Sequence, residues 1–224
     1  SFRVERRSEL AIITTPMPDL KSFCHLQVHS EYSLLESPIR VDDLCKRVAE
    51  LGMSAVALTA LGNFFGAIEF YKAAKAAGIK PIFGCEIYLA ARQHKDKEPY
   101  LDKKNTRLIL LAKDQTGYQN LIKLISIGHV EGFYYKPRVD LPLLQKYHQG
   151  LICLSGGLGG HLSSAILQRM DPLAVEERAR QLKAVFGSDF YLQICHHSVP
   201  DQKIWVPLII NISRALDIAL VLSN

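Results

Sequence analysis

The sequence lacks the cysteine patterns that are typical of disulfide-bonded and zinc-binding proteins. Five cysteines are spread over 224 residues, and no two of them form a Cys-x-x-Cys pair. This spacing argues against a disulfide framework and against a cysteine-bound zinc site, so we expect reduced thiols. The sequence also lacks an apolar run of membrane-spanning length and a signal-peptide layout at its start. We therefore expect a cytoplasmic protein with no membrane partner.

A strong charge bias is also missing. Charged residues make up 22% of the chain, the formal net charge is +5, and 48% of the residues are apolar. This is a globular composition with enough apolar residues for a sizeable core. Lysine and arginine are scattered rather than gathered in one stripe, which gives little support for direct DNA binding by this chain.

The first 22 residues do not share the pattern of the rest. Pro16 and Pro18 argue against a long helix there, and the apolar run 10–13 predicts at most an edge strand. A regular rhythm of apolar and amphipathic segments begins at Phe23. We therefore assign residues 1–22 to an N-terminal extension and residues 23–224 to a single domain.

Strands and helices alternate along this domain. The alternation predicts parallel strands joined by right-handed crossovers, either in an open doubly wound sheet or in a closed β/α barrel. In both folds chemistry belongs at the carboxyl ends of the strands. Pro207 should kink or shorten its helix. The charged stretch 92–104 is predicted to be a surface loop. The stretch 132–143 is predicted to be irregular or partly extended. The predicted strands are 24–28, 54–58, 79–90, 108–112, 151–154, 190–194 and 219–222, and the predicted helices are 40–51, 65–77, 115–127, 161–169, 172–186 and 201–216.

Few residues at these strand ends can bind a metal or carry out catalysis. His29 follows the first apolar run, and a lone histidine that ends a strand explains it as well as a metal ligand does. Glu86 stands within an apolar stretch and needs a partner, which could be a salt bridge or a cation. Glu36 and one of His196 or His197 are the remaining candidates, because neighbouring residues of an extended segment point to opposite sides.

Two other patterns are weak. The glycine-dense loop 155–160 precedes a helix and could cradle a phosphate, but it lacks the lysine and hydroxyl of a Walker motif. Glycine that serves loop geometry is the better interpretation. We find no Ser-His-Asp or Cys-His arrangement, and Cys153 lies inside an apolar strand as a core residue would.

The block Phe23-Cys-His-Leu-Gln-Val-His-Ser-Glu-Tyr-Ser-Leu-Leu-Glu36 and the block Leu51-Gly-Met-Ser-Ala-Val-Ala-Leu-Thr-Ala-Leu-Gly-Asn63 open a series of ordered motifs. Together these motifs resemble the PHP domain (polymerase and histidinol phosphatase domain) of bacterial replicative DNA polymerase III alpha subunits. The resemblance extends to Asn224. It implies a distorted seven-stranded (β/α)7 barrel with a trinuclear-type metal cleft at the carboxyl ends of its strands. The blocks are residues 23–36, 51–63, 65–75, 78–88, 117–121, 131–140 and 150–155.

The departures from this family fall on the metal ligands. Three ligand positions are retained: His29, Glu86 and, as a glutamate in place of an aspartate, Glu36. Relatives with a complete site have His-x-His in the first block, Thr-Asp-His-Gly-Asn in the second, a later histidine, and a cysteine after a Leu-Ser pair. The replacements at these positions are Gln27, Ala60, Leu61, Arg107 and Gly157.

Losing several ligands at once should abolish metal binding, since disturbing a single outer partner already costs about 10–100-fold. Leu61 would place an apolar group where a hydrated cation should lie. Arg107 adds a positive charge that should pair with Glu86 and take the place of the cation. We therefore expect no cofactor in this domain, with zinc or manganese as the alternative.

The resemblance supports a non-catalytic module. It implies packing on the remainder of the polymerase alpha subunit and docking of the proofreading exonuclease, with DNA and magnesium reached only through the parent polymerase. The alternative is an active metal-dependent phosphoesterase or 3′–5′ exonuclease, which would need His196 or His197 and a downstream Asp-x-His beyond Asn224. A stand-alone histidinol-phosphate type of phosphatase is disfavoured by the polymerase-like block 131–140. Because the sequence stops within a family motif, we expect a piece of a longer chain.

Overall fold

The computed structural model describes residues 23–195 and 199–223. The predicted extension 1–22, with its candidate strand 10–13, lies outside the described residues, and so do His196, His197 and Asn224.

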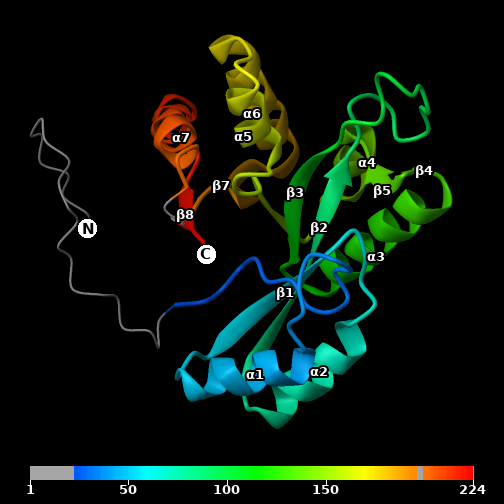
Figure 1. Ribbon diagram of the computed structural model, residues 1–224, viewed down its shortest axis with the longest axis vertical. Helices are drawn as coiled ribbons and strands as arrows, with labels where there is room; N and C mark the ends of the chain where they lie inside the picture. Colours follow the sequence, from blue (N-terminus) through cyan, green and yellow to red (C-terminus); the bar gives the residue numbers. More distant parts are fainter. Residues whose placement is uncertain (1–22, 196–198, 224) are drawn as a thin grey trace, which may run out of the picture.

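A mixed sheet forms the centre of the fold and curls into half a barrel (Figure 1). Its order is β4-β5-β2-β3-β6-β7-β8, and β1 pairs with β2 beside β5. Apart from the two-residue β4, it contains seven strands among the described residues, in agreement with the predicted α/β barrel. The strands are β1 (Ala55–Leu61), β2 (Lys80–Leu89), β3 (Thr106–Ala112), β4 (Phe133–Tyr134), β5 (Lys136–Val139), β6 (Leu151–Leu154), β7 (Phe190–Ile194) and β8 (Leu220–Leu222).

Helices pack against the strands in two groups. The pair α1–α2 shares a core with β1, and α3 to α7 share a larger core with β2, β3, β6 and β7. Within the described ranges, no helix has the combined length and apolar character of a membrane span. The helices are α1 (Val41–Glu50), α2 (Ala67–Ala76), α3 (Gln115–Val130), α4 (Leu141–Tyr147), α5 (His161–Leu167), α6 (Pro172–Phe186) and α7 (Gln202–Leu216), with a 3₁₀ turn η2 (Gly187–Asp189) before β7.

The alternation of side chains along β3 separates the two sides of the sheet. Leu108 and Leu110 join the large core under the helices, whereas Ile109 joins a small inner cluster with Ala57 and Leu154. Because side chains alternate with a period of two, Arg107 shares the inner side with Ile109. Glu86 of β2 is paired in register with Ile109 and so faces the same interior. The two charged residues therefore lie on the inner side of the curl.

The strand directions correct one prediction. β2 pairs with β3 in the antiparallel sense, and β3 pairs with β6 in the antiparallel sense, whereas we predicted an all-parallel sheet. The reason lies in the connection 90–105, which contains no helix that could carry the chain back across the sheet. β3 therefore returns directly alongside β2.

The predicted strand 24–28 is also wrong as a regular strand. The structure gives only an isolated parallel bridge between His25 and Val56, although the segment does run alongside β1. The side chain of Thr59 accounts for part of the difference. Its hydroxyl accepts a hydrogen bond from the backbone N–H of Val28 at 3.0 Å, which takes the place of a main-chain partner. The segment is held against β1 all the same, because the Thr59 N–H donates to the Val28 carbonyl at 2.9 Å.

Two further segments differ from expectation. The stretch 132–143, which we predicted to be irregular or partly extended, contains the short strands β4 and β5 as extended segments, but it also contains the unpredicted start of α4. Asp140 caps α4 by accepting from the Leu143 N–H, and Pro142 follows in the first turn, which is a recognisable helix start. Pro207 lies inside α7 and does not shorten it, since the helix runs to Leu216.

Arg138 of β5 organises the long loop between β2 and β3. Its guanidinium is fully buried and donates to the carbonyl oxygens of Gly132, His94, Asp96 and Asp102 at 2.7–3.1 Å. A buried charge is tolerated when its donors are satisfied in this way. The conformation of residues 92–105 therefore depends on a residue far along the chain.

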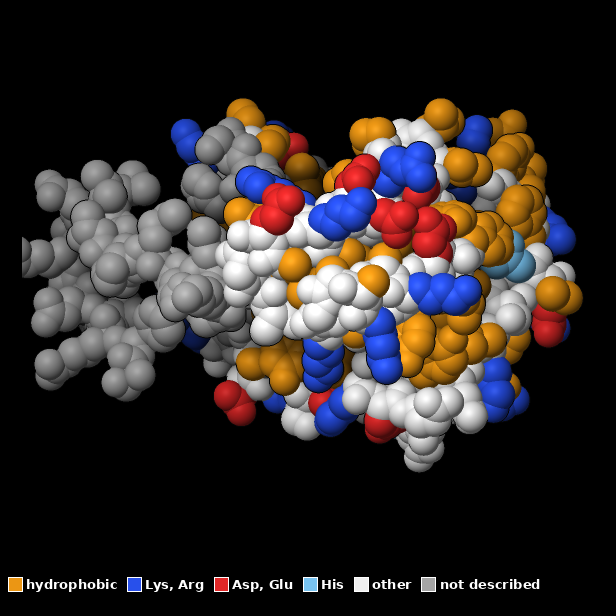
Figure 2. All heavy atoms as spheres, turned by 90° about the horizontal axis from the view of Figure 1, so that it is seen from below, with side chains coloured by type: hydrophobic (Ala, Val, Ile, Leu, Met, Phe, Trp, Pro, Cys, Tyr) orange, Lys and Arg blue, Asp and Glu red, His pale blue; other side chains and the backbone are white. Residues whose placement is uncertain are grey.

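Part of the surface is apolar. Figure 2 shows hydrophobic side chains gathered next to a histidine on the face seen from below. Phe65 is 70% exposed and Phe133 is 50% exposed, and both rings contact the imidazole of His129. We call Phe65, His129 and Phe133 the aromatic patch, and we include Val130, which is exposed and follows His129 in the sequence.

Candidate functional site

A cavity of about 390 Å³ opens at the mouth of the half-barrel. Its lining comes from β2, from the start of the antiparallel strand β3, and from residues 27–39, 157–159 and 195 outside the strands. Six of the eight residues predicted for the site line it, although they are scattered over 131 positions of the sequence. These residues are Gln27, His29, Glu36, Glu86, Arg107 and Gly157.

Glu86 is the centre of this site. Its side chain is 3% exposed, and both carboxylate oxygens are engaged. Oε2 lies 2.6 Å from His29 Nε2 and accepts a hydrogen bond of 2.9 Å from the Gln27 amide. Oε1 accepts from Arg107 Nη1 at 3.3 Å. A buried carboxylate is therefore surrounded by donors on both sides, as its burial requires.

Arg107 connects the two carboxylates of the cavity. Besides Glu86, its Nη2 lies 3.5 Å from Glu36 Oε1, and the guanidinium carbon lies 5.8 Å from the ring centre of Tyr88. The predicted pairing of Arg107 with Glu86 is confirmed. The arginine thus lies where it can balance the negative charge of this cavity with a permanent positive charge.

The surroundings of Glu86 favour its charged form. Burial by itself raises the pKa of this carboxyl. The hydrogen bond and charge of His29, the charge of Arg107 and the hydrogen bond from Gln27 outweigh the burial, so the pKa of Glu86 lies below its usual range. Glu86 is therefore an anion at neutral pH.

Sequence reasoning missed Gln193 of β7. This side chain is fully buried, and its amide donates to Gln27 Oε1 at 2.7 Å, so a chain of hydrogen bonds runs from β7 through Gln27 to Glu86. An amide in the apolar run 190–194 is the signal that could have pointed to it. Cys195, which also lines the cavity, follows two residues later.

Gly157 lies close to the side chains of Gln27 and Cys195. A Cβ added there would meet Gln27 Oε1 at 3.7 Å and Cys195 Sγ at 3.8 Å, which are ordinary contact distances. The position therefore has room for a side chain that points toward Gln27. Its φ of +30° disfavours any residue other than glycine.

Ala60 and Leu61 do not join the cavity. Among the described residues, its lining includes neither of them. Ala60 is buried on the outer side of β1, in a small hollow with Phe70 of α2. The N–H of Leu61 donates to Ser33 Oγ at 3.0 Å, which joins the end of β1 to the loop that carries Glu36. Leu61 is paired in register with Glu86, so the two side chains lie on the same side of the sheet, and the prediction that Leu61 fills the place of a cation stays a prediction.

The donors present do not fit a divalent cation. In the ranges 23–195 and 199–223, no three histidine, cysteine, aspartate or glutamate side chains are grouped as metal ligands. Both oxygens of Glu86 already bind nitrogen donors, and Arg107 carries a charge that repels a metal ion. Catalytic zinc usually has three protein ligands and an open position, and this cavity offers only His29 and Glu86 close together.

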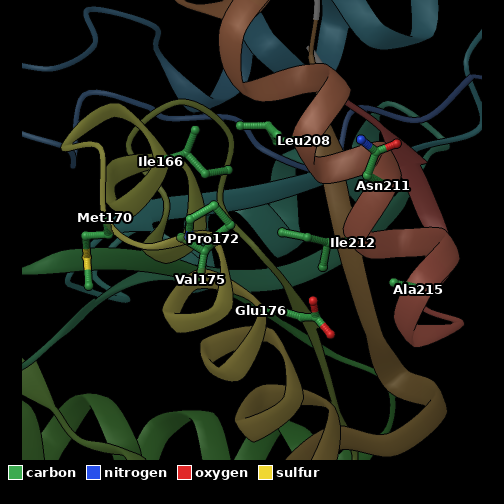
Figure 3. A pocket seen from close by; sticks show the side chains of 9 residues that line it. All are labelled: Ile166, Met170, Pro172, Val175, Glu176, Leu208, Asn211, Ile212 and Ala215. Carbon is green, nitrogen blue, oxygen red and sulfur yellow. The ribbon is translucent and has the colours of Figure 1, made fainter.

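A second hollow lies between α5, α6 and α7 (Figure 3). Its volume is about 290 Å³, and Ile166, Val175 and Ile212 point into it. Glu176 is its only titratable residue. This hollow can accept apolar groups, but it lacks the paired acids, bases or nucleophiles that catalysis needs.

We expect Glu86→Gln to destabilise the domain by about 3 kcal/mol at pH 7, because it removes the buried anion to which Arg107, His29 and Gln27 are hydrogen-bonded. The folded pKa of Glu86 is lowered. Its contribution is therefore fully present above the unfolded pKa of about 4.3 and is lost as the pH falls through the folded pKa. Urea unfolding from pH 7 to pH 3 should show the difference between wild type and variant shrinking at acid pH.

Glu50→Gln is the matched control for this measurement. Glu50 forms a surface pair with Arg47, both largely exposed, so its replacement should change stability little at any pH. A difference between wild type and Glu86→Gln that stays constant down to pH 3 would contradict the assigned role of the carboxylate.

Several curated proteins named DNA polymerase III subunit alpha are similar to this chain. Identity is 46% over 203 residues for the protein of Borreliella burgdorferi, 43% over 205 residues for that of Treponema pallidum and 43% over 206 residues for that of Thermus aquaticus. These alignments cover 90–91% of this chain but only 17–18% of each relative. The chain thus spans about one sixth of the length of the relatives it matches.

Solved structures share the fold at low identity. An amidohydrolase from Chromobacterium violaceum, with bound sulfate and no metal, aligns with a TM-score of 0.54 and 12% identity over 90% of this chain and 86% of that chain. A protein assigned as a metal-dependent phosphoesterase from Bifidobacterium adolescentis aligns with a TM-score of 0.53 and 10% identity, over 89% of this chain and 86% of that chain. The family model described as "PHP domain" matches residues 25–197, which is most of the chain. The chain therefore belongs to the PHP domain family.

Proposed function

We propose that this chain is the PHP domain of a bacterial replicative DNA polymerase III alpha subunit, and that the domain is non-catalytic. One observation carries the proposal. The side chains of Arg107 and Gln27 occupy the oxygens of Glu86 that a metal ion would need. The identity of 46% to a polymerase III alpha subunit supports the placement in a replicative polymerase.

In this proposal residues 23–224 form the domain, residues 1–22 precede it as an extension, and the protein is cytoplasmic. His29, Glu36 and Glu86 are vestigial ligand positions, and Gln27, Ala60, Leu61, Arg107 and Gly157 are the positions where ligands have been lost. Arg107 takes the place of the cation by neutralising Glu86 and Glu36. The parent subunit, with its own magnesium ions, would carry out nucleotide transfer on DNA.

The competing function is a metal-dependent phosphoesterase or 3′–5′ exonuclease. We expect the wild-type chain to hold no stoichiometric zinc or manganese, and we expect Gln27→His/Arg107→His to gain it. Both positions line the cavity, so the double variant would offer three imidazoles and Glu86 in one place. Metal content after dialysis and isothermal titration with zinc and with manganese measure the gain.

Adding His29→Gln to the double variant is the control, and it should weaken the new metal site at least about tenfold. A wild-type chain that binds metal stoichiometrically, and that cleaves single-stranded DNA in a manner abolished by Glu86→Gln, would reverse the proposal in favour of the exonuclease.

We further propose that the aromatic patch is covered by the remainder of the alpha subunit. The relatives are about six times longer than the matched region, so most of their mass lies elsewhere, and exposed aromatic clusters of this kind mark contact surfaces. Val130, which follows His129 in the sequence, is 83% exposed.

Phe65→Ser/Phe133→Ser tests this contact. In the 224-residue chain the double change should alter stability by less than about 1 kcal/mol, because both rings are half-exposed or more. In the full-length subunit it should cost about 2 kcal/mol or more and increase proteolysis between the domain and the rest of the chain. Leu173→Ser, which is equally exposed on α6, is the control, and equal effects of the two changes in both contexts would contradict the contact.

The second proposed partner is the proofreading exonuclease subunit. We expect the 224-residue chain to form a complex with that subunit in size-exclusion chromatography, because a domain without catalysis of its own retains a docking role. Arg107→His should leave the complex intact, since Arg107 lies within the cavity and not on a protruding surface. If the exonuclease subunit does not co-elute with the 224-residue chain but does co-elute with an alpha subunit that lacks residues 23–224, the docking site lies elsewhere.

A further inference from the structure

A third cavity lies on the outer side of the sheet, behind the candidate site. It has a volume of about 220 Å³ and is formed by the end of β2, the start of α4, and α5 and α6. Arg178, His161, Arg92 and Gln181 line it together with apolar groups, and within the described part of the chain no carboxylate is among its lining residues. This is the reverse of the candidate site, where two glutamates face the cavity.

Arg178 distinguishes this cavity. The structure gives its guanidinium one hydrogen bond, from Nη1 to the carbonyl oxygen of His161 at 3.4 Å. Among the described residues, no aspartate or glutamate lies within ion-pair distance of it. Burial lowers the pKa of Arg178, and no neighbouring carboxylate counters that effect. The other arginine of the cavity differs, because Arg92 forms two hydrogen bonds to Asp102.

His161 supplies a second donor. Its Nδ1 lies 2.8 Å from the hydroxyl of Thr106, and burial together with the charge of Arg178 lowers the pKa of His161 to about 4. The imidazole is therefore neutral at pH 7. If the Thr106 hydroxyl donates to Nδ1, the proton of the ring is on Nε2, and that nitrogen is available to an acceptor.

We propose that this cavity binds a phosphate group, held by Arg178 and His161. Planar guanidinium groups bind phosphate oxygens through two parallel hydrogen bonds. Arg178 is half-buried and has no carboxylate partner among the described residues, so an anion in the cavity would supply its counter-charge. Pockets for larger ligands measure about 300–1,000 Å³, so this smaller volume suits a phosphate group rather than a whole nucleotide. The proposal does not depend on the proposed polymerase function.

The position of the cavity gives the anion a structural consequence. Thr106 and Arg107 are adjacent on β3, so their side chains lie on opposite sides of the sheet. Thr106 contacts His161 behind the sheet, and Arg107 contacts Glu86 within the half-barrel. A bound phosphate would thus fix α5 and α6 against the strand that carries Arg107.

Titration of the 224-residue chain with sodium phosphate, at constant ionic strength, tests the site. We expect a saturable rise in Tm relative to chloride, and an upward shift of the His161 pKa when its imidazole signal is followed by NMR. Arg178→Gln should weaken phosphate binding about tenfold or more, because it removes a charge-assisted pair. Arg180→Gln is the control, since Arg180 lies on the same helix but pairs with Glu176 at the surface.

Three further measurements keep the outcome decisive. Arg178→Lys keeps the charge and should retain part of the phosphate binding. This result would show that the loss of binding in Arg178→Gln comes from the lost charge and not from misfolding. Binding of deoxyadenosine monophosphate as well as phosphate would mean that a phosphomonoester enters, and binding of phosphate alone would mean that free phosphate is the ligand. No saturable shift, or binding abolished by Arg107→Gln but retained by Arg178→Gln, would overturn the proposal.

Discussion

Glu86 is the constraint on which the mouth of the half-barrel depends. A carboxylate that is 3% exposed needs charged or hydrogen-bonding partners, and the structure supplies them from two separate parts of the chain. Gln27 and His29 come from the segment beside β1, and Arg107 comes from β3. These contacts join the first segment to the centre of the sheet, where regular strand pairing is missing. The polar cluster therefore contributes to closure of the fold as well as to the charge of the cavity.

Sheet geometry explains why these partners meet. Glu86 is paired with Ile109, two residues from Arg107, and the antiparallel return of β3 places Arg107 at the same end of the sheet as the end of β2. Had β3 run parallel to β2, as the alternation of elements predicts, Arg107 would lie at the opposite end. The absence of a crossover helix in residues 90–105 is thus what brings the guanidinium to the carboxylate. Arg138, in turn, holds that connection through three of its carbonyl groups.

The elements themselves could be predicted, because they depend on local periodicity. β6, β7 and α6 have the predicted bounds, and the other predicted helices differ by one to three residues at an end, whereas α4 was not predicted. Strand direction and the side on which a residue lies depend on contacts between distant segments. The pairing of Arg107 with Glu86 could nevertheless be predicted, from charge and from the position in the family. Gln193 was missed, since an amide inside an apolar strand has no spacing that links it to Gln27.

The proposed exchange of a cation for Arg107 has a physical logic. Apolar residues can replace a buried ion pair at little cost, but only when both partners change, and here Glu86 and His29 are still present. A residue that keeps the positive charge avoids leaving a buried carboxylate unpaired. Arginine does this with hydrogen-bond donors alone. It offers no open coordination position and cannot lower the pKa of a water molecule as a metal ion does. In this role, the side chain that stabilises Glu86 also removes the Lewis acid on which hydrolysis would depend.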